Sequence, residues 1–393
     1  MMSERMKQSG RALVVILLMT ALCACAPKSR KAVGIMDTPE HHYNQGITFL
    51  DRKAFNDAGK EFALALELDE AYGPALAGQG LLTVIQGDDD GLKMIFKGER
   101  KADGAWEKVQ AVAAEIRAYI VMKKGGRSSE TLMIRNAKAA FAKGMLVNKD
   151  ASILYFYMGE AYLQGLDFGP AEAMFAQSKA LQGGFEERAY ERWKFVQKAN
   201  LAAPESMIGK KIALVEKLRR ADMAALLVEE LNVERFYNRT QEPETVSFEA
   251  PKGIMMQGED LYTKKDVTDI ADNPLRSDID KVLALGVPGM QAYPDHTFRP
   301  GVPVSRVEAA QLFQDIIVRA TGKQDLATEY IGDTSRMPDV PSDHWGYNAV
   351  RLCTTRGIMH TDIRNNSFYP QEVISGVDAL LSIKEIKRAL TVF

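Results

Sequence analysis

This chain of 393 residues contains few cysteines and few histidines, and neither positive nor negative charge is in clear excess. Three cysteines exclude a disulfide scaffold and a four-thiolate zinc site, and five histidines disfavour a histidine-rich metal centre. The 50 Lys and Arg residues nearly balance the 52 Asp and Glu residues, which gives a formal charge of −2. Because nucleic-acid-binding proteins usually carry a basic excess, we expect no nucleic-acid partner.

Sequence motifs for catalysis are missing as well. The chain has no His-Glu-x-x-His zinc motif and no Gly-x-Ser-x-Gly nucleophile elbow. We therefore predict a protein that is not an enzyme and that needs neither a cofactor nor a metal. Apolar residues make up 46% and charged residues 26%, which is typical of a folded protein of two or three domains.

The N-terminus carries an export signal. An apolar run from Ala12 to Leu22 follows a basic segment. It is too short to cross a bilayer, which needs about 20 residues, and its length and flanks are typical of a secretory signal. The run ends in Leu-Cys-Ala-Cys at 22–25, which resembles a bacterial lipobox with Cys25 as the lipidated residue. The alternative is an ordinary signal peptide that happens to contain two cysteines.

The lipobox resemblance implies a lipoprotein whose signal peptide is residues 1–24. By resemblance to enterobacterial sorting, Ala26 after the lipidated cysteine implies the outer membrane. Residues 25–38 contain several basic residues, a proline and a glycine, and we interpret them as a tether. Cys353 then remains as a single thiol.

Residues 39–200 show a repeated helical pattern. Between Tyr43 and Leu76, small residues such as Gly46 alternate with large ones such as Phe62 at spacings that place them where two helices cross. The pattern resembles a tetratricopeptide repeat, a helix pair of about 34 residues. Gly80 follows Gly46 by one length of this repeat. The resemblance predicts a helical solenoid.

Further copies keep the same spacing. The sequence separation between Gly46 and Phe62 recurs in two other copies. It is found between Gly80 and Phe96 and between Gly159 and Phe175. A degenerate copy contains Ala137 and Phe141, and residues 106–122 supply its displaced first helix. We expect about four repeats, with Gly46, Phe62, Ala171 and Phe175 in the core.

Such arrays present a concave groove to a peptide or a protein, so the resemblance implies an unknown protein partner. Repeats that clamp an acidic C-terminal tail typically have Asn just after the glycine. Here those positions are Ile47, Leu81 and Glu160, which disfavours that kind of clamp.

Residues 201–393 contain an internal repeat of another kind. The segment 293–310 includes Tyr-Pro-Asp-His-Thr-Phe-Arg-Pro and, after a short gap, Ser-Arg-Val-Glu-Ala-Ala. A second copy includes 338–345 and 366–370, and Asp339, Phe368 and Pro370 each follow their counterparts at one constant offset. A truncated third copy at 217–227 precedes both. The pattern resembles S-layer homology modules.

This resemblance implies an α-rich domain in which three modules form a pseudo-threefold unit with short β-hairpins outside. Residues 195–203 are a candidate for the missing first helix of the truncated module. Ser305 with Glu308 three residues later predicts a capping box at the start of one helix. Together with the repeats, the predicted fold class is mainly α.

The family binds cell-wall polymers in grooves between modules, and an arginine at the helix start typically contacts an acidic group on the glycan. Arg220 and Arg306 match that arginine, whereas Gly376 occupies the place in the last copy. A guanidinium suits this role because it binds carboxylate bidentately at any relevant pH. The family tryptophan is present as Trp345 but is Leu275 in the preceding copy. For the arginines the alternative is that they only brace loops. Trp345 is a candidate for glycan binding, but we expect it to be a core residue rather than a ligand contact.

We therefore predict a lipid-anchored tether of the bacterial cell envelope, in the outer membrane and facing the periplasm. Its C-terminal modules would bind peptidoglycan or a wall-linked acidic glycan, and its helical array would recruit a protein. The alternative is a surface-layer or envelope assembly factor that uses both regions for protein contacts.

Overall fold

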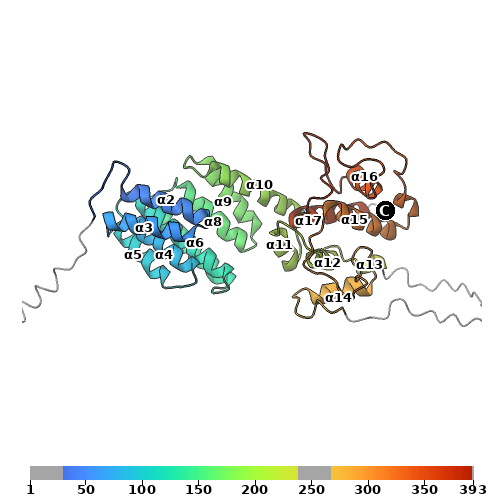
Figure 1. Cartoon of the computed structure of the whole chain (residues 1–393), viewed down its shortest axis with the longest axis horizontal. Coiled ribbons are helices and arrows are strands. Elements are labelled where there is room, and N and C mark those ends of the chain that lie inside the picture. Colours follow the sequence, from blue (N-terminus) through green and yellow to red (C-terminus); the bar gives the residue numbers. More distant parts are fainter. Residues whose placement is uncertain (1–29, 238–266, 392–393) are drawn as a thin grey trace, which may run out of the picture. The chain divides into compact units, whose positions relative to one another are not determined.

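The computed structural model describes residues 30–237 and 267–391, which form two compact units (Figure 1). Unit 1 ends at Tyr190 and unit 2 begins at Glu191. This boundary falls inside the helix α10 (Glu186–Ala202), ten residues before the expected end of the repeats at residue 200. The predicted signal peptide and Cys25 lie outside the described residues.

The described residues are mainly helical, as predicted, and none of them forms an extended strand. Two isolated antiparallel bridges, Arg219 with Pro303 and Ser305 with Val373, pair residues far apart in the sequence rather than the two arms of a hairpin. The hairpin prediction is therefore wrong for the described residues. The reason is that the turns concerned are closed by an aspartate side chain and by left-handed residues, as described below.

Unit 1 is built from consecutive helix pairs. Each pair packs internally, and successive pairs stack through their first helices, α4 on α6 and α6 on α8, with α2 also contacting α4. The helices are α2 (Pro39–Asp51), α3 (Phe55–Leu68), α4 (Gly73–Ile85), α5 (Gly91–Lys101), α6 (Gly104–Lys124), α7 (Glu130–Val147), α8 (Ser152–Gln164) and α9 (Phe168–Ala180). The expected displaced helix at 106–122 is the central part of α6.

The glycine–phenylalanine spacing of the sequence corresponds to close helix packing. A Cβ atom on Gly46 would lie 2.5 Å from the ring of Phe62, and one on Gly159 would lie 2.7 Å from Phe175. Both rings are fully buried. Each glycine is therefore required because the aromatic ring occupies the space that a side chain would need.

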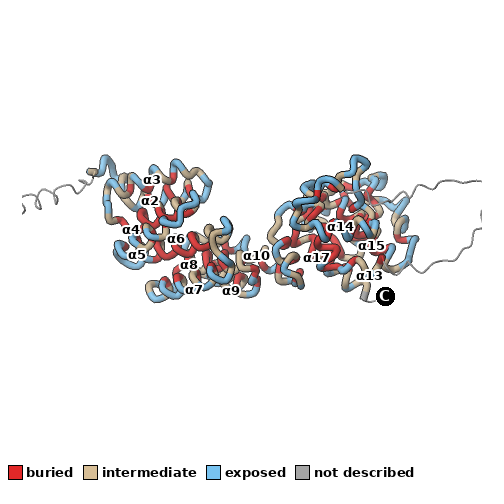
Figure 2. The backbone as a smooth tube through the Cα atoms, turned by 90° about the horizontal axis from the view of Figure 1, so that it is seen from below, coloured by how far each residue is buried: buried red, intermediate tan, exposed pale blue. Residues whose placement is uncertain are grey.

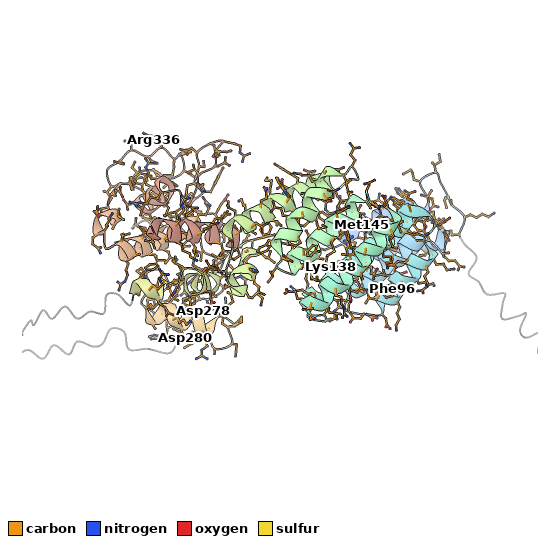
Figure 3. The ribbon with its side chains drawn as sticks, turned by 180° about the vertical axis from the view of Figure 1, so that it is seen from behind. Phe96, Lys138, Met145, Asp278, Asp280 and Arg336 are labelled. Atoms are coloured by element: carbon orange, nitrogen blue, oxygen red, sulfur yellow. The ribbon has the colours of Figure 1, made fainter. Side chains whose placement is uncertain are left out.

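The second pair departs from the expected register. A Cβ atom on Gly80 would meet the backbone of Gly91 at 2.5 Å and the side chain of Ile95 at 2.9 Å. Ile95 is fully buried, whereas Phe96 is only half-buried on α5 (Figure 3). Phe96 thus keeps the sequence spacing of Phe62 but does not share its place in the core. The glycine contact lets the two backbones touch, which leaves room for an aliphatic side chain and none for a ring.

Residues 30–38, the described part of the expected tether, are held by hydrogen bonds. The backbone N–H of Arg30 donates to the Glu67 carbonyl at 2.7 Å, and its guanidinium binds Asp37 through two hydrogen bonds of 2.7 and 2.8 Å. Thr38 caps α2 by accepting from the N–H of His41. The chain is therefore bonded to the first helix pair from Arg30 onward.

Unit 1 also contains a half-buried ionic cluster. The ammonium of Lys143 on α7 lies 2.5 Å from Glu99 and 2.6 Å from Glu115. The Tyr119 hydroxyl donates to Glu115 at 2.9 Å. Burial and the neighbouring carboxyl of Glu115 raise the pKa of Glu99 to about 7.

This pKa predicts that unit 1 loses stability as the pH rises from about 4.5 to about 7, because the folded chain favours the protonated form of Glu99. After allowance for solvent screening the loss is about 1–2 kcal/mol. Glu99→Gln removes the titration and should flatten this part of the profile. Chemical denaturation between about pH 4.5 and pH 8 measures the effect, with Glu70→Gln on the exposed surface as the control. A wild-type profile parallel to that of Glu99→Gln would contradict the assignment.

Unit 2 consists of three helix pairs. The helices are α11 (Met207–Ala213), α12 (Arg220–Glu229), α13 (Glu234–Tyr237), α14 (Arg276–Ala284), α15 (Arg306–Thr321), a 3-10 helix η2 (Gln324–Ala327), α16 (Tyr347–Thr355) and α17 (Gly376–Thr391). We call residues 207–237, 267–327 and 336–391 the first, second and third modules. Each helix pair joins two modules: α11 packs on α17, α14 packs on α12 and α16 packs on α15.

The pairing corrects the expectation for the first module. Its short first helix is α11 rather than residues 195–203, which belong to α10 up to Ala202. The second and third modules place a long turn between their two helices. The first module keeps only residues 214–219 there.

Three backbone hydrogen bonds join the modules in a ring. The N–H of Leu218 donates to Ile374, that of Ile374 donates to Val304, and that of Val304 donates to Leu218, at 2.9, 3.0 and 2.9 Å. Each of these residues lies two positions before the first residue of α12, α15 or α17. The ring has approximate threefold symmetry, and many of the buried residues of unit 2 lie on α12, α15 and α17 (Figure 2).

An aspartate closes the long turn in the second and third modules. The carboxylate of Asp339 accepts from the N–H groups of Phe368 and Tyr369 at 2.9 and 2.7 Å. Asp269 does the same for Phe298 and Arg299 at 2.8 and 2.7 Å. Equivalent residues in both turns have positive φ, so the internal repeat extends to the backbone conformation.

We expect Asp339→Ala to lower the free energy of unfolding of unit 2 by about 2 kcal/mol, because two backbone N–H groups lose charge-assisted hydrogen bonds. Thermal and urea unfolding measure the change. Asp343→Ala, on the exposed part of the same loop, is the control and should be neutral. Equal unfolding curves for the two variants would contradict this role of Asp339.

Candidate functional site

A groove of about 390 Å³ lies in unit 2 where parts of all three modules meet. Arg220 comes from the start of α12 in the first module, Tyr293 from the long turn of the second, and Trp345 from the residues before α16 in the third. The complete lining is Arg220, 289–294, 302–304, Glu308, Gln311, Leu312, Asp315 and Trp345. We call it the Arg220 groove. Two of the residues expected to bind glycan, Arg220 and Trp345, are thus brought together.

The guanidinium of Arg220 is held by backbone carbonyls of the second module. Its Nε, Nη1 and Nη2 atoms donate to Phe298, Gly289 and Gln291 at 3.0, 2.7 and 3.1 Å. It also lies over the rings of Phe298 and Tyr293, at 4.7 and 5.0 Å from their centroids. A guanidinium has five N–H groups, so three brace the turn and two remain for other acceptors. Arg220 therefore braces the turn of the second module, as one of the alternatives stated. It still has N–H groups that can bind a ligand.

Arg306 has the same local geometry at the next interface. Its Nε donates to Phe368 at 2.7 Å and its Nη2 donates to His360 at 2.8 Å, and the guanidinium lies 4.6 Å from the centroid of the Phe368 ring. It does not line the Arg220 groove. Its role in glycan binding stays a prediction.

Gly376 marks the third interface, where no side chain can be accommodated. A Cβ atom on Gly376 would lie 1.8 Å from the carbonyl oxygen of Ile212. Its N–H donates to Val215 at 2.8 Å. The end of α11 therefore occupies the space that an arginine would need.

Trp345 belongs to the surface. Its side chain is 62% exposed, and it stacks on His344 with ring centroids 5.5 Å apart. The expectation that Trp345 is a core residue is therefore wrong. An exposed indole at the mouth of a groove can stack on the apolar face of a sugar ring.

The Arg220 groove is the most complete of the three interfaces within the described residues. Beside Arg306, the position of Tyr293 is taken by Ile363, and the residues before α11 are Glu205 and Ser206 rather than a tryptophan. Both of these bind Glu230 through their backbone N–H groups. Among the described residues, the Arg220 groove therefore has aromatic side chains at two positions where the Arg306 interface has none.

Two lining residues, Asp315 and Glu308, were not identified from the sequence as site residues. Both lie on α15, seven residues apart, together with Gln311 between them. Spacings of three, four and seven residues place side chains on one face of a helix, so helical periodicity counted from the capping box could have found them.

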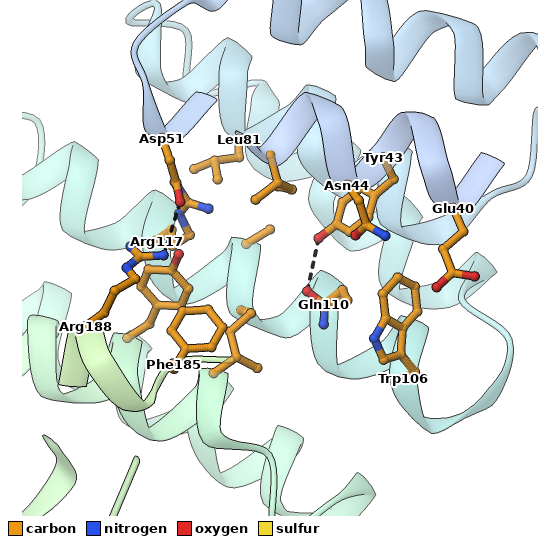
Figure 4. Close-up of a pocket in the computed structure, with 15 residues that line it drawn as sticks. Glu40, Tyr43, Asn44, Asp51, Leu81, Trp106, Gln110, Arg117, Phe185 and Arg188 are labelled. Carbon is orange, nitrogen blue, oxygen red and sulfur yellow. Dashed lines mark hydrogen bonds and ion pairs between the residues drawn. The ribbon is translucent and has the colours of Figure 1, made fainter. Parts of the chain in front are cut away.

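Unit 1 has its own groove of about 300 Å³ between α2, α6 and α8 (Figure 4). Asp51 at the end of α2 accepts from Arg117 at 2.7 Å and from Arg188 at 3.2 Å. The Tyr43 hydroxyl donates to Gln110 at 3.2 Å. Burial raises the pKa of Tyr43, so this hydroxyl remains a neutral donor.

The walls of this groove are aromatic and aliphatic. Trp106, 42% exposed, meets Tyr43 edge to face with centroids 5.9 Å apart. Ile47 and Leu81, the positions after the repeat glycines, line the groove as apolar side chains. The surface suits a mixed apolar and hydrogen-bonding ligand such as a peptide.

Metal-binding and membrane-spanning features are absent from the described part of the chain. Within residues 30–237 and 267–391, no group of three or more His, Cys, Asp or Glu residues is arranged to hold a metal ion. The helices of the same residues include none with both the length and the apolar character that crossing a membrane requires.

Comparison with known proteins identifies one domain. Residues 336–379 match the family model of the S-layer homology domain. No curated protein and no solved structure matches the chain. The matched residues include Asp339, Trp345 and Gly376, so they cover most of the third module. Such a domain implies binding of a cell-wall or envelope polymer and a place at the bacterial cell surface or envelope.

Proposed function

We propose that the chain is a non-enzymatic tether of the bacterial cell envelope, whose unit 2 binds peptidoglycan or a wall-linked acidic glycan. The observation that carries this proposal is the Arg220 groove, which joins the matched domain to the two preceding modules. The groove places an exposed indole and a fixed guanidinium in one lining, and its volume lies within the ~300–1,000 Å³ range of small-ligand sites.

The chemistry of the groove supports a saccharide ligand. Trp345 offers a flat apolar face, and Gln291 and Gln311 offer amides that can pair with hydroxyl groups. The bracing carbonyls fix Arg220 in place, so little side-chain entropy would be lost when its remaining N–H groups bind an acceptor.

The rest of the tether is proposed from the other parts of the chain. A lipid on Cys25 would hold the protein in the outer membrane, facing the periplasm. The groove of unit 1 would bind a protein partner, for which its mixture of aromatic walls, Gln110 and paired charges is suited. Two moderate contacts on one chain raise each other's effective concentration, so neither needs high affinity.

Co-sedimentation of the full chain with purified peptidoglycan sacculi tests the proposal. We expect the protein to be retained, and retention to fall when Arg220 and Arg306 are both replaced by alanine. Thermal unfolding must accompany this variant because both arginines brace turns. A folded wild-type chain that stays in the supernatant would overturn the proposal and favour an assembly factor that makes only protein contacts.

A further inference from the structure

The Arg220 groove contains more negative than positive charge. Its ionisable lining residues with a charge at neutral pH are Arg220, Glu308 and Asp315. The sum is one negative charge, even though the groove was expected to receive an acidic group. Because opposite charges attract most strongly where water is partly excluded, this sum opposes an acidic ligand and favours a cationic one.

Asp315 is the least satisfied of these groups. It is half-buried, and within the described residues its side chain accepts one hydrogen bond, from the amide of Gln311 at the long distance of 3.4 Å. No ion pair joins it to a lysine or arginine in the same part of the chain. Burial raises its pKa, which is the sign of a carboxylate that has lost water without gaining a partner.

The other charges of the groove are already engaged. Three N–H groups of Arg220 are bound to carbonyls, as described above. One oxygen of Glu308 accepts from the Ser305 N–H and hydroxyl at 2.8 and 2.7 Å in the capping box of α15. Asp315 is therefore the lining group with the most to gain from a bound cation.

We propose that the Arg220 groove binds a saccharide unit that carries a free amine, with Asp315 accepting from the ammonium group and Trp345 stacking on the sugar ring. The inference rests on the proposed function and narrows its ligand. It selects an amine-bearing stretch of wall polymer over a purely acidic glycan.

Isothermal titration of the full chain, held in detergent, tests the ligand class with three soluble tetramers. These are glucosamine tetramer, its fully N-acetylated form and galacturonate tetramer. We expect the free-amine tetramer to bind about 10-fold tighter than the other two, the scale of one charge-assisted hydrogen bond. Equal or tighter binding of the acetylated or acidic tetramer, or no binding of the free-amine tetramer, would overturn the inference.

Asp315→Asn assigns the preference to one residue. The variant keeps the shape of the side chain and removes its charge, so the preference for the free amine should disappear. The matched control is Glu385→Gln, at the equivalent position of α17 in the third module, where Glu385 pairs with Arg388 at 3.0 Å. A preference that survives in Asp315→Asn would contradict the assignment.

Sacculi separate this inference from the proposed function. If the protein is retained on native sacculi and equally on sacculi whose amines have been acetylated, the tether stands and the amine inference fails. If native sacculi do not retain the folded protein, the proposed function itself fails.

Discussion

Replacement of Gly376 by alanine should destabilise unit 2 by about 3 kcal/mol or more, which is beyond the usual cost of an added methyl group in a core. The new Cβ atom would lie 1.8 Å from the carbonyl oxygen of Ile212 and 2.8 Å from its carbon. Both are backbone atoms, so no side-chain rotation can relieve the overlap. The start of α17 would have to move away from the end of α11.

That movement would also break hydrogen bonds that join the modules. The N–H of Gly376 donates to Val215, and Ile374 belongs to the ring of three bonds at the centre of unit 2. We therefore expect Gly376→Ala to lower the unfolding midpoint in urea and Gly376→Arg to prevent folding of unit 2.

The chain offers a matched control in Gly301. A Cβ atom there would meet nothing within 4 Å, and its φ is not in the left-handed region. Gly301→Ala should change the free energy of unfolding by less than about 0.5 kcal/mol. Equal free energies of unfolding for Gly376→Ala and Gly301→Ala would contradict this. They would mean that the third interface has room for a side chain and that Gly376 merely stands where other copies have arginine.

The sequence allowed much of the architecture to be predicted where a local pattern determines the structure. The internal repeat placed Asp269 and Asp339 at equivalent positions of two modules. In the structure, each accepts hydrogen bonds from two N–H groups at equivalent positions of its own module. The spacing of Gly46 and Phe62 likewise predicted a helix crossing. These features depend on residues that contact one another within a single module or helix pair.

Features set by contacts between distant segments were harder to predict. Ile95 replaces Phe96 in the core because two glycine-containing backbones touch, and α11 replaces residues 195–203 because it packs on α17, at the far end of the chain. Asp315 joins the site only because the turn of its module and the start of α12 meet beside its helix face. Helical periodicity places Asp315 on the same helix face as Glu308, but it does not show which distant segments meet at that face.

The exposure of Trp345 leads to the prediction with the largest expected effect on binding. Trp345→Ala should weaken retention on sacculi by about 30-fold, the roughly 2 kcal/mol that a central aromatic contributes at a binding site. Its side chain is 62% exposed, so the same change should cost less than about 0.5 kcal/mol in stability. Binding and folding can therefore be separated more cleanly at this residue than at Arg220, whose loss would also release three carbonyls.

Trp106→Ala is the matched control for Trp345→Ala. Trp106 is also a half-exposed tryptophan at the edge of a groove, but it lies in unit 1. We expect it to leave sacculus retention unchanged while Trp345→Ala abolishes most of it. Binding that depends equally on both would point to non-specific adhesion through exposed aromatics. Retention that survives Trp345→Ala but is lost in Arg306→Ala, with both variants folded, would move the polymer site to the second interface, where Ile363 stands in place of an aromatic wall.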